Sequence, residues 1–184
     1  YRSIYNIYAC NGILFNHESP RRGEDFVTKK IVSTLKRMSS NRKSEETLEL
    51  GNIDVLKDWG HAKDFVRAKW EIMQLPSPED FIVATGEQHT VREFVEIAGR
   101  YFGYNIQWEG AGLQEIGRDW RTGSPVVSIS QKFFRPIESP PTYGDFSKLK
   151  NATGWEPKFS FEEMVHDMCF YEQTGRESEK KWIQ

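Results

Sequence analysis

Residues 11–23 read NGILFNHESPRRG, and this stretch decides the fold because an apolar run leads directly into a cluster of polar groups. The apolar run is ILF at 13–15, and the polar cluster ends in two adjacent arginines, Arg21 and Arg22. In parallel α/β sheets, ligands bind just beyond the carboxyl ends of the strands. Adjacent guanidinium groups bind phosphate or carboxylate oxygens through paired donors. The stretch therefore predicts one wall of an anion site, and the alternative is a polar loop after a buried strand.

Strand and helix patterns alternate along the chain outward from this stretch. Residues 4–15 are rich in β-formers and nearly continuously apolar from residue 7, as in a strand covered on both faces. The expected helices lie at about 25–38, 61–75, 90–102 and 160–171, and the last two begin with the capping-box patterns TVRE and SFEE. Short strands are expected near 47–50, 81–84, 104–108 and 126–129, with a Gly-rich polar excursion between the last two. The alternation predicts an α/β chain with a mostly parallel sheet component.

Composition narrows the class of protein. The chain has 184 residues, of which 38% are hydrophobic, and this length and content support a real core. The net charge of -2 argues against a protein that binds nucleic acid by neutralising many phosphates. No apolar stretch is long enough to span a membrane and no signal peptide is visible, so we expect a cytoplasmic protein. Cys10 and Cys169 are expected to be reduced, and the four histidines show no metal-ligand spacing.

Residues 57–64, KDWGHAKD, place an ionic cluster at the expected start of a helix. One interpretation is an anion held by the free amides of the helix and by a lysine. The other is an ordinary helix N-terminus with a stabilising acid and a buried Trp59. The residues alone do not decide between the two.

Two further features point to ligand contacts. In the segment FFRPIE at 133–138, Arg135 can hold a phosphate while Glu138 accepts hydrogen bonds from a ribose or a base, although a mutual salt bridge is the simpler alternative. Gly51 follows an expected strand, where the lack of a side chain lets a backbone approach a ligand closely. The lysines at 29 and 30 lie one turn into a helix, where lysines are usually solvated.

Several segments together resemble the second half of the GDP-mannose 4,6-dehydratases, which are extended short-chain dehydrogenases/reductases. The segments are NGILFNHESPRRG, FVTKKI, LGNIDVLKDWGHAKDFVRA, DFIVATGEQHTVREFVE and FFRPIES, in matching order and spacing over nearly the whole chain. The resemblance implies an α/β fold made of the C-terminal part of an NAD(P)-binding Rossmann fold plus a smaller α/β substrate-binding domain. It places the Rossmann elements at about 1–16 and 60–86, and the substrate-binding domain at about 17–59 and 87–184.

The resemblance also implies an activity. In this family, bound NADP removes a hydride from C4 of GDP-mannose, water is eliminated across C5 and C6, and the hydride returns to C6. The product is GDP-4-keto-6-deoxymannose. The partners that follow are GDP-mannose, an N-terminal Rossmann half and further copies in a homo-oligomer, with no nucleic acid and no membrane.

The resemblance implies roles for individual residues of this chain. His17 and Arg22 match residues that contact the cofactor, and Asn16 matches one on the sugar-phosphate side of the substrate. The remaining substrate positions are Lys30, Lys57 and Arg135 near the diphosphate, Gly51 where backbone approaches the guanine, and Glu138 at a ribose or base. The resemblance implies no metal ligand.

The chain departs from the family in two ways. At Lys57 the family usually has arginine, and lysine keeps the charge but loses the planar two-pronged grip. The family's catalytic tyrosine and lysine, spaced YxxxK, occur nowhere in these 184 residues, and we expect them shortly before Tyr1. The chain therefore contributes no catalytic residue, and by itself it is expected to be inactive.

Two alternatives to a portion of a dehydratase remain open. The first is a non-catalytic nucleotide-sugar binding module that works as a partner or regulator. The second is an epimerase or reductase relative that acts on another nucleoside-diphosphate sugar.

Overall fold

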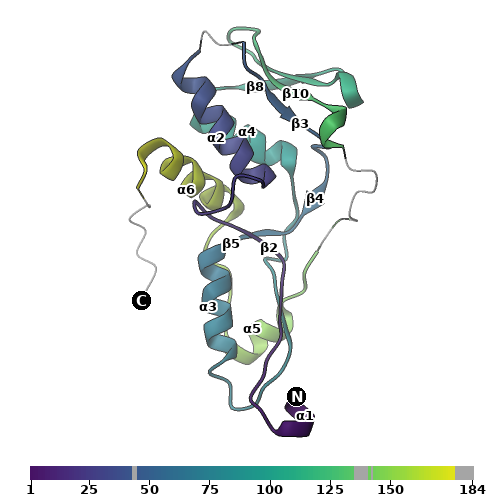
Figure 1. Cartoon of the computed structure of the whole chain (residues 1–184), viewed down its shortest axis with the longest axis vertical. Coiled ribbons are helices and arrows are strands. Elements are labelled where there is room, and N and C mark those ends of the chain that lie inside the picture. Colours follow the sequence, from purple (N-terminus) through teal and green to yellow (C-terminus); the bar gives the residue numbers. More distant parts are fainter. Residues whose placement is uncertain (43–44, 135–140, 142, 177–184) are drawn as a thin grey trace.

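The computed structural model describes residues 1–42, 45–134, 141 and 143–176. Figure 1 shows an elongated molecule with two groups of elements along its long axis. The upper group contains α2 (Val27–Ser40), α4 (Val91–Tyr101), α6 (Phe161–Thr174) and the strands β3 (Leu48–Leu50), β8 (Ile106–Glu109), β9 (Ile116–Asp119) and β10 (Pro125–Ile129). The lower group contains α1 (Arg2–Tyr5), α3 (Ala62–Ile72), α5 (Ser147–Thr153), β1 (Gly12–Leu14) and β6 (Phe81–Val83). The junction is formed by β2 (Asn16–Glu18), β4 (Leu56–Lys57), β5 (Trp59–His61) and β7 (His89–Thr90).

The upper sheet is mixed. Its strand order is β3-β10-β9-β8, in which β3 pairs parallel with β10 while the other two pairs are antiparallel. The expected Gly-rich excursion between 108 and 126 is wrong in part, because it contains β9 as well as the 3₁₀ turn η1 (Gly112–Gln114). Gly117 makes this strand hard to recognise in the sequence. A Cβ at this position would lie 2.9 Å from the Ile106 side chain. The glycine lets β8 and β9 pack closely.

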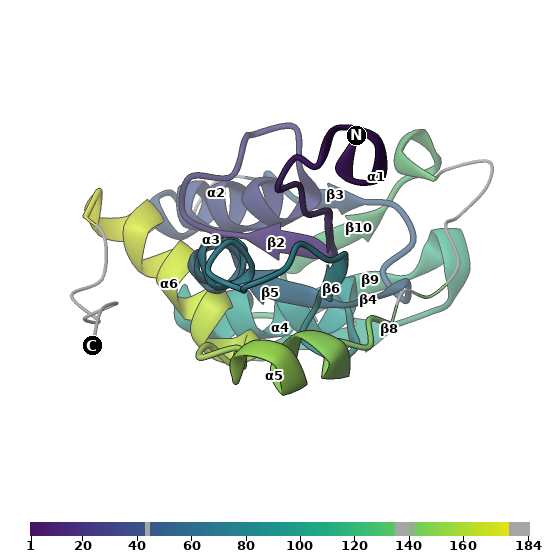
Figure 2. The same ribbon diagram turned by 90° about the horizontal axis from the view of Figure 1, so that it is seen from below.

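Parallel pairing occurs at the junction and in the lower group. β1 pairs parallel with β6, and β2 pairs parallel with β5, whereas β4 and β7 are antiparallel. The parallel component predicted from the sequence is therefore present as short pairs. Figure 2 views the lower group from below, where α3 and α5 both pack against β6.

The prediction of a strand over residues 4–15 is largely wrong. Only Gly12–Leu14 pairs as β1, and the segment begins with the short helix α1, which ends where Asn6 adopts a left-handed conformation at φ 52°. Ile4 and Ile13 are 79% and 55% exposed, so the segment is not covered on both faces. The composition of residues 4–15 is typical of a buried strand. The Tyr5 amide instead donates to the Tyr1 carbonyl oxygen and closes a helical turn.

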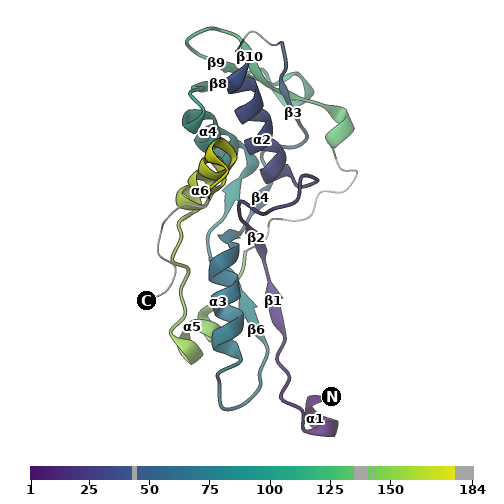
Figure 3. The same cartoon turned by 60° about the vertical axis from the view of Figure 1, so that its left-hand side comes forward.

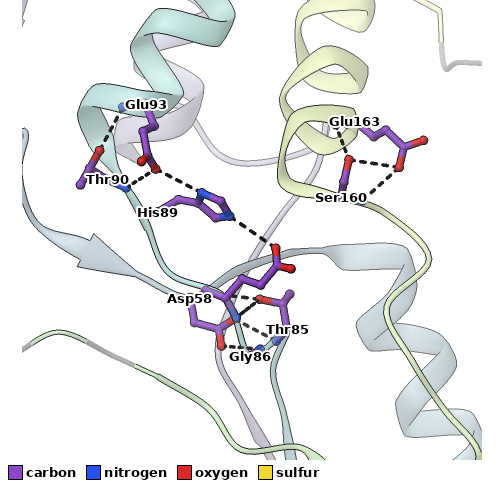
Figure 4. Close-up of polar contacts among 9 residues, drawn as sticks. Asp58, Thr85, Gly86, His89, Thr90, Glu93, Ser160 and Glu163 are labelled. Atoms are coloured by element: carbon purple, nitrogen blue, oxygen red, sulfur yellow. Dashed lines mark hydrogen bonds and ion pairs between the residues drawn. The ribbon is translucent and has the colours of Figure 1, made fainter.

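The four long helices are confirmed. α4 and α6 each begin with a complete capping box, in which Thr90 pairs with Glu93 and Ser160 with Glu163 (Figure 4). Each box satisfies free amides at the helix start, which explains why the sequence signal was reliable. The short helix α5 was missed because one buried residue, Leu149, leaves it without an apolar stripe.

Two hydrophobic clusters correspond to the two groups. The larger lies between the upper sheet and α2, α4 and α6, whereas the smaller lies among α3, α5, β1 and β6 (Figure 3). The smaller cluster includes Leu149 and Trp155, both fully buried. The predicted domain boundaries stay a prediction, but these two residues belong to the cluster that includes segments 1–16 and 60–86 as well as Phe146.

A buried carboxylate joins the two groups. Asp58 lies between β4 and β5, is 0% exposed, and accepts hydrogen bonds on Oδ1 from the Thr85 amide at 2.9 Å and hydroxyl at 2.7 Å (Figure 4). Its Oδ2 accepts from the amides of Gly86 at 3.0 Å and Gly144 at 3.2 Å. One side chain therefore fixes three separate chain segments.

We expect Asp58→Asn to lower the free energy of unfolding by about 3 kcal/mol, because an amide group would face N–H donors in place of a carboxylate oxygen. Urea denaturation followed by circular dichroism measures the effect. The control is Asp54→Asn, since this exposed carboxylate pairs with Arg92 at 2.9 Å at the surface and its loss should cost less than about 1 kcal/mol. Equal destabilisation by the two variants would contradict the role of Asp58.

Candidate functional site

A cleft of about 740 Å³ opens at the junction, between β2, the start of α2, the end of β3 and β4. Among the described residues, four cationic side chains line it: Arg22, Lys30, Lys57 and Lys132. Two described acids, Glu18 and Asp25, also line it. Positive charge thus exceeds negative charge in this lining, as suits an anionic ligand. Its remaining side chains include Leu50, Val55, Trp59, Val91, Phe133 and Phe134, which form an apolar wall.

A second, more open groove of about 680 Å³ lies in the lower group, along β6 and α5. Its lining contains one cation, Lys148, whose amino group already pairs with Glu79 at 2.8 Å. This groove therefore lacks the concentration of positive charge that marks the junction cleft.

The cleft brings together five of the predicted site residues. Asn16 comes from β2, Arg22 from the following loop, Lys30 from α2, Gly51 from the end of β3 and Lys57 from β4. Segments up to about forty residues apart in the sequence thus meet around one cavity. Their meeting agrees with the resemblance, while the contact assigned to each residue stays a prediction.

His17 lies outside this cleft. Side chains alternate along β2, so Asn16 and Glu18 line the cleft while His17 points to the other face of the strand. There its ring stacks on Phe65 at a centroid distance of 4.9 Å, and its Nδ1 lies 2.9 Å from the Phe15 carbonyl oxygen. The predicted contact between His17 and the cofactor therefore lies on the face of β2 opposite to the face that carries Asn16.

Arg22 is held by two neighbours in the cleft wall. Its guanidinium carbon lies 3.4 Å from the centroid of the Phe26 ring, and its Nε lies 3.1 Å from Oε2 of Glu18. Glu18 is 3% exposed and also accepts a 2.7 Å hydrogen bond from the Thr28 hydroxyl. Burial raises the pKa of Glu18, and the Thr28 hydroxyl and the Arg22 charge act in the opposite direction. The sequence did not single out Glu18, although its alternation with Asn16 on a strand was a usable signal.

Lys30 is likewise stacked. Its amino group lies 3.3 Å from the centroid of the Phe133 ring, so the cation is held against an aromatic face. Burial lowers the pKa of Lys30, while the charge of Glu49 raises it and that of Lys132 lowers it further. The expectation that the neighbouring lysines are merely solvated is wrong, since Lys29 also pairs with Glu172 at 2.6 Å.

Gly51 allows a close backbone approach inside the protein itself. A Cβ at this position would lie 2.3 Å from the carbonyl oxygen of Phe133 and 3.2 Å from the amide nitrogen of Phe134. The glycine thus lets the 133–134 segment close one side of the cleft. The predicted approach of this backbone to a guanine stays untested.

The ionic cluster at 57–64 includes the start of helix α3. His61 is fully buried and caps α3 by accepting the Lys63 amide at 3.1 Å. Asp64 lies in the first turn, where one carboxylate oxygen accepts the amides of Lys158 and Phe159 at 3.0 Å each. These contacts and the buried Trp59 agree with the interpretation as a helix N-terminus, while the anion interpretation stays untested. Lys57 reaches the junction cleft from β4.

Four further expectations concern Arg135 and Glu138, metal ligands, membrane-spanning helices and the two cysteines. Arg135 and Glu138 lie outside the described residues. Within the part of the chain that the structure describes, no three histidine, cysteine, aspartate or glutamate side chains are grouped as metal ligands. No helix among the described residues has the length and apolarity to cross a bilayer. Cys10 and Cys169 are both free thiols, as predicted.

Comparison with known proteins gives a consistent result. The family model described as GDP-mannose 4,6 dehydratase matches residues 1–168. The GDP-mannose 4,6 dehydratase of Drosophila melanogaster is 51% identical over 168 residues, covering 91% of this chain and 42% of the relative. The human GDP-mannose 4,6 dehydratase is 46% identical, covering 91% of this chain and 45% of the relative. The chain thus spans less than half the length of these two relatives.

Solved structures show the same fold at low identity. RMD from Pseudomonas aeruginosa, solved in complex with NADPH, matches with a TM-score of 0.72 and 16% identity, over 94% of this chain and 50% of that chain. The dTDP-glucose 4,6-dehydratase of Bacillus anthracis, solved with NAD, matches with a TM-score of 0.65 and 17% identity, over 94% and 47%. These likenesses support the predicted α/β fold with a partial Rossmann fold.

The structure and the comparisons lead to one assignment. Because the family model matches 168 of the 184 residues, the chain belongs to the GDP-mannose 4,6-dehydratase family.

Proposed function

We propose that this chain is the C-terminal portion of a GDP-mannose 4,6-dehydratase, a lyase that converts GDP-mannose to GDP-4-keto-6-deoxymannose with bound NADP. The observation that carries the proposal is the meeting of Asn16, Arg22, Lys30, Gly51 and Lys57 around one cleft in a chain of this family. The family resemblance assigns these residues to ligand contacts.

The chemistry of the cleft suits a sugar nucleotide. A diphosphate carries concentrated negative charge, and the cations of the cleft supply charge-assisted hydrogen bonds to its oxygens. The apolar side chains Trp59, Phe133 and Phe134 offer a surface against which a base or sugar ring can lie. Asn16 offers both a donor and an acceptor to a sugar hydroxyl. Binding and orientation are therefore the roles that we assign to this chain.

The residues present fit part of an NADP site. Arg22 offers terminal N–H donors that match a phosphate or a carboxamide oxygen, and the parallel strands β1 and β6 end at Leu14 and Val83, close in sequence to Asn16 at the start of β2. Such strand ends are where dinucleotides bind in Rossmann folds. When bound, NADP supplies the acceptor and donor of a hydride. We assign Arg22, and His17 on the other face of β2, to its contacts.

The catalytic tyrosine and lysine belong, in this proposal, to a further part of the parent protein. None of the seven tyrosines in the chain has a lysine four residues later. The proposal includes a cytoplasmic parent that assembles as a homo-oligomer. The single most informative observation is the sequence that precedes Tyr1 in the parent, where YxxxK within about thirty residues supports the proposal.

We expect Lys30→Met in the parent protein to weaken GDP-mannose binding about tenfold, because the variant keeps the aliphatic stem on Phe133 but removes the charge. Isothermal titration calorimetry measures the dissociation constant. The control is Lys36→Met on the same helix, since Lys36 bonds Ser40 at 2.9 Å and lies outside the cleft.

Two results would contradict the proposed substrate. One is equal affinity of the Lys30→Met and wild-type proteins for GDP-mannose. The other is displacement of GDP-mannose by a UDP- or dTDP-sugar at lower concentration than by unlabelled GDP-mannose, which would favour the epimerase or reductase alternative.

The isolated chain carries an exposed apolar face that the proposal explains. Val66 and Trp70 on α3 and Met73 at its C-terminal cap recur at helical spacing and are 63%, 64% and 52% exposed. The opposite face of the helix is buried through Phe65 and Ile72. A contiguous apolar stripe of this kind marks an interaction surface. We assign it to the remaining half of the parent protein.

We expect the isolated chain to self-associate and Trp70→Lys to shift it toward monomer, because a charge in the stripe opposes apolar contact. Sedimentation velocity at several concentrations measures the change. The matched control is Trp120→Lys, since Trp120 is 58% exposed but lies at the end of β9, far along the chain from the stripe. A monomeric wild-type chain that binds GDP-mannose at micromolar affinity would favour the binding-module alternative.

A further inference from the structure

Arg22 depends on two residues that the family resemblance does not assign. Oε2 of Glu18 lies 3.1 Å from its Nε, and the centroid of the Phe26 ring lies 3.4 Å from its guanidinium carbon. Within the described part of the chain, these two side chains provide the charge and ring contacts of the guanidinium. Neither contact is made to a terminal amino group, and Arg22 lines the cleft.

Glu18 is itself fixed before any ligand enters. It belongs to β2, whose backbone pairs with β5, and its carboxylate receives the Thr28 hydroxyl from the first turn of α2. Thr28 is 1% exposed, so this bond is shielded from water. The carboxylate therefore has little freedom to follow Arg22, whereas the long side chain of Arg22 can settle against the carboxylate.

The electrostatic situation of Arg22 is unusual for an arginine. Its Nε is buried and forms no hydrogen bond among the described residues, although it lies within ion-pair distance of Glu18. Charge attraction to Glu18 and stacking on Phe26 thus hold the guanidinium, whereas among the described residues no carboxylate binds it through two hydrogen bonds. A two-pronged pair would occupy donors that an anionic ligand needs.

We propose that Glu18 is a positioning residue which, together with the Phe26 ring, holds the Arg22 guanidinium so that its terminal amino groups meet an anionic group of the bound nucleotide. The identification of that anion as a nucleotide phosphate rests on the proposed function. The hold on Arg22 does not, because every contact in it lies within the described residues. Preorganisation of this kind favours binding because less side-chain freedom is lost when the ligand arrives.

The hold is tested first without any ligand. Nuclear magnetic resonance resolves arginine Nε–Hε groups, and the Arg22 signal is identified by its loss in Arg22→Lys. We expect Glu18→Gln, which keeps the size of the side chain and an acceptor for Thr28, to speed hydrogen exchange of this group about tenfold or more. Glu24→Gln, an exposed acid in the same loop, should leave the rate unchanged.

The ligand step is tested by a double-mutant cycle in the parent protein with NADP as the probe, because Arg22 is assigned to the cofactor. We expect Glu18→Gln to weaken NADP binding about fivefold in the wild-type background and less than about twofold when Arg22 is already lysine. A merely structural role for Glu18 would instead give the same loss in both backgrounds. Additive losses would therefore overturn the proposal.

A second variant and the ligand-free measurement distinguish failure of the hold on Arg22 from failure of the proposed function. If Glu18→Gln does not fold, Phe26→Leu removes the other contact at a residue that is 47% exposed, and it should speed the same exchange. If the wild-type parent does not bind NADP, the proposed function fails while the exchange rates still decide the role of Glu18. An Arg22 exchange rate that neither substitution changes would overturn the hold itself.

Discussion

The buried carboxylate of Asp58 is the interaction on which the rest of the structure depends. It binds backbone amides at 85, 86 and 144 and so ties the β4–β5 connection to the end of β6 and to the segment before α5. The residues on either side of Asp58 both line the cleft. Trp59 also contacts Phe94 and Phe161 in the upper core at centroid distances of 5.9 and 6.0 Å. The same short segment therefore anchors the core and presents a cation to the site.

Close packing at this joint leaves no room for an extra side-chain atom. A Cβ on Gly144 would lie 2.1 Å from the Cβ of Ala84, and one on Gly60 would lie 2.4 Å from the Phe65 ring. Gly86 has a positive φ of 74°, which favours glycine. The Asp58 carboxylate reaches its donors because three glycines allow the strands and loops to meet at backbone distance. Tight geometry at the joint then fixes the relative position of the cleft walls above it.

The sequence predicted elements well where local chemistry decides them. The capping boxes at Thr90 and Ser160 and the apolar stripe of α2 depend on neighbouring residues alone, and the structure confirms all three. Prediction failed where a distant contact decides the conformation. Gly117 belongs to a strand because of its neighbours in β8, and the apolar segment 4–8 is exposed because composition does not determine what covers it.

The candidate site shows the same division. Charge and position after a strand pointed to Arg22, the family resemblance assigned Lys30 and Lys57, and the cleft brings the three together. Nothing in the sequence indicated that Phe133 would lie under Lys30, because a contact across about a hundred residues has no local signature. The helix start at 57–64 was ambiguous for the same reason, since the amides that bind Asp64 come from residues 158 and 159. Residue type thus predicted which charges matter, and tertiary packing decided how they are held.

Strand β2 gives the site its two sides. Because successive side chains of a strand point to opposite faces, Asn16 and Glu18 must share the cleft while His17 must leave it. A one-residue shift in the pairing of β2 with β5 would exchange these faces and remove Glu18 from Arg22. The proposed sugar-nucleotide contacts and the proposed cofactor contact of His17 therefore require the same register, and the parallel pairing of Asn16 with Trp59 sets it. Trp59 is held in the core beside Asp58, so the joint that unites the two groups also determines which side chains face the ligand.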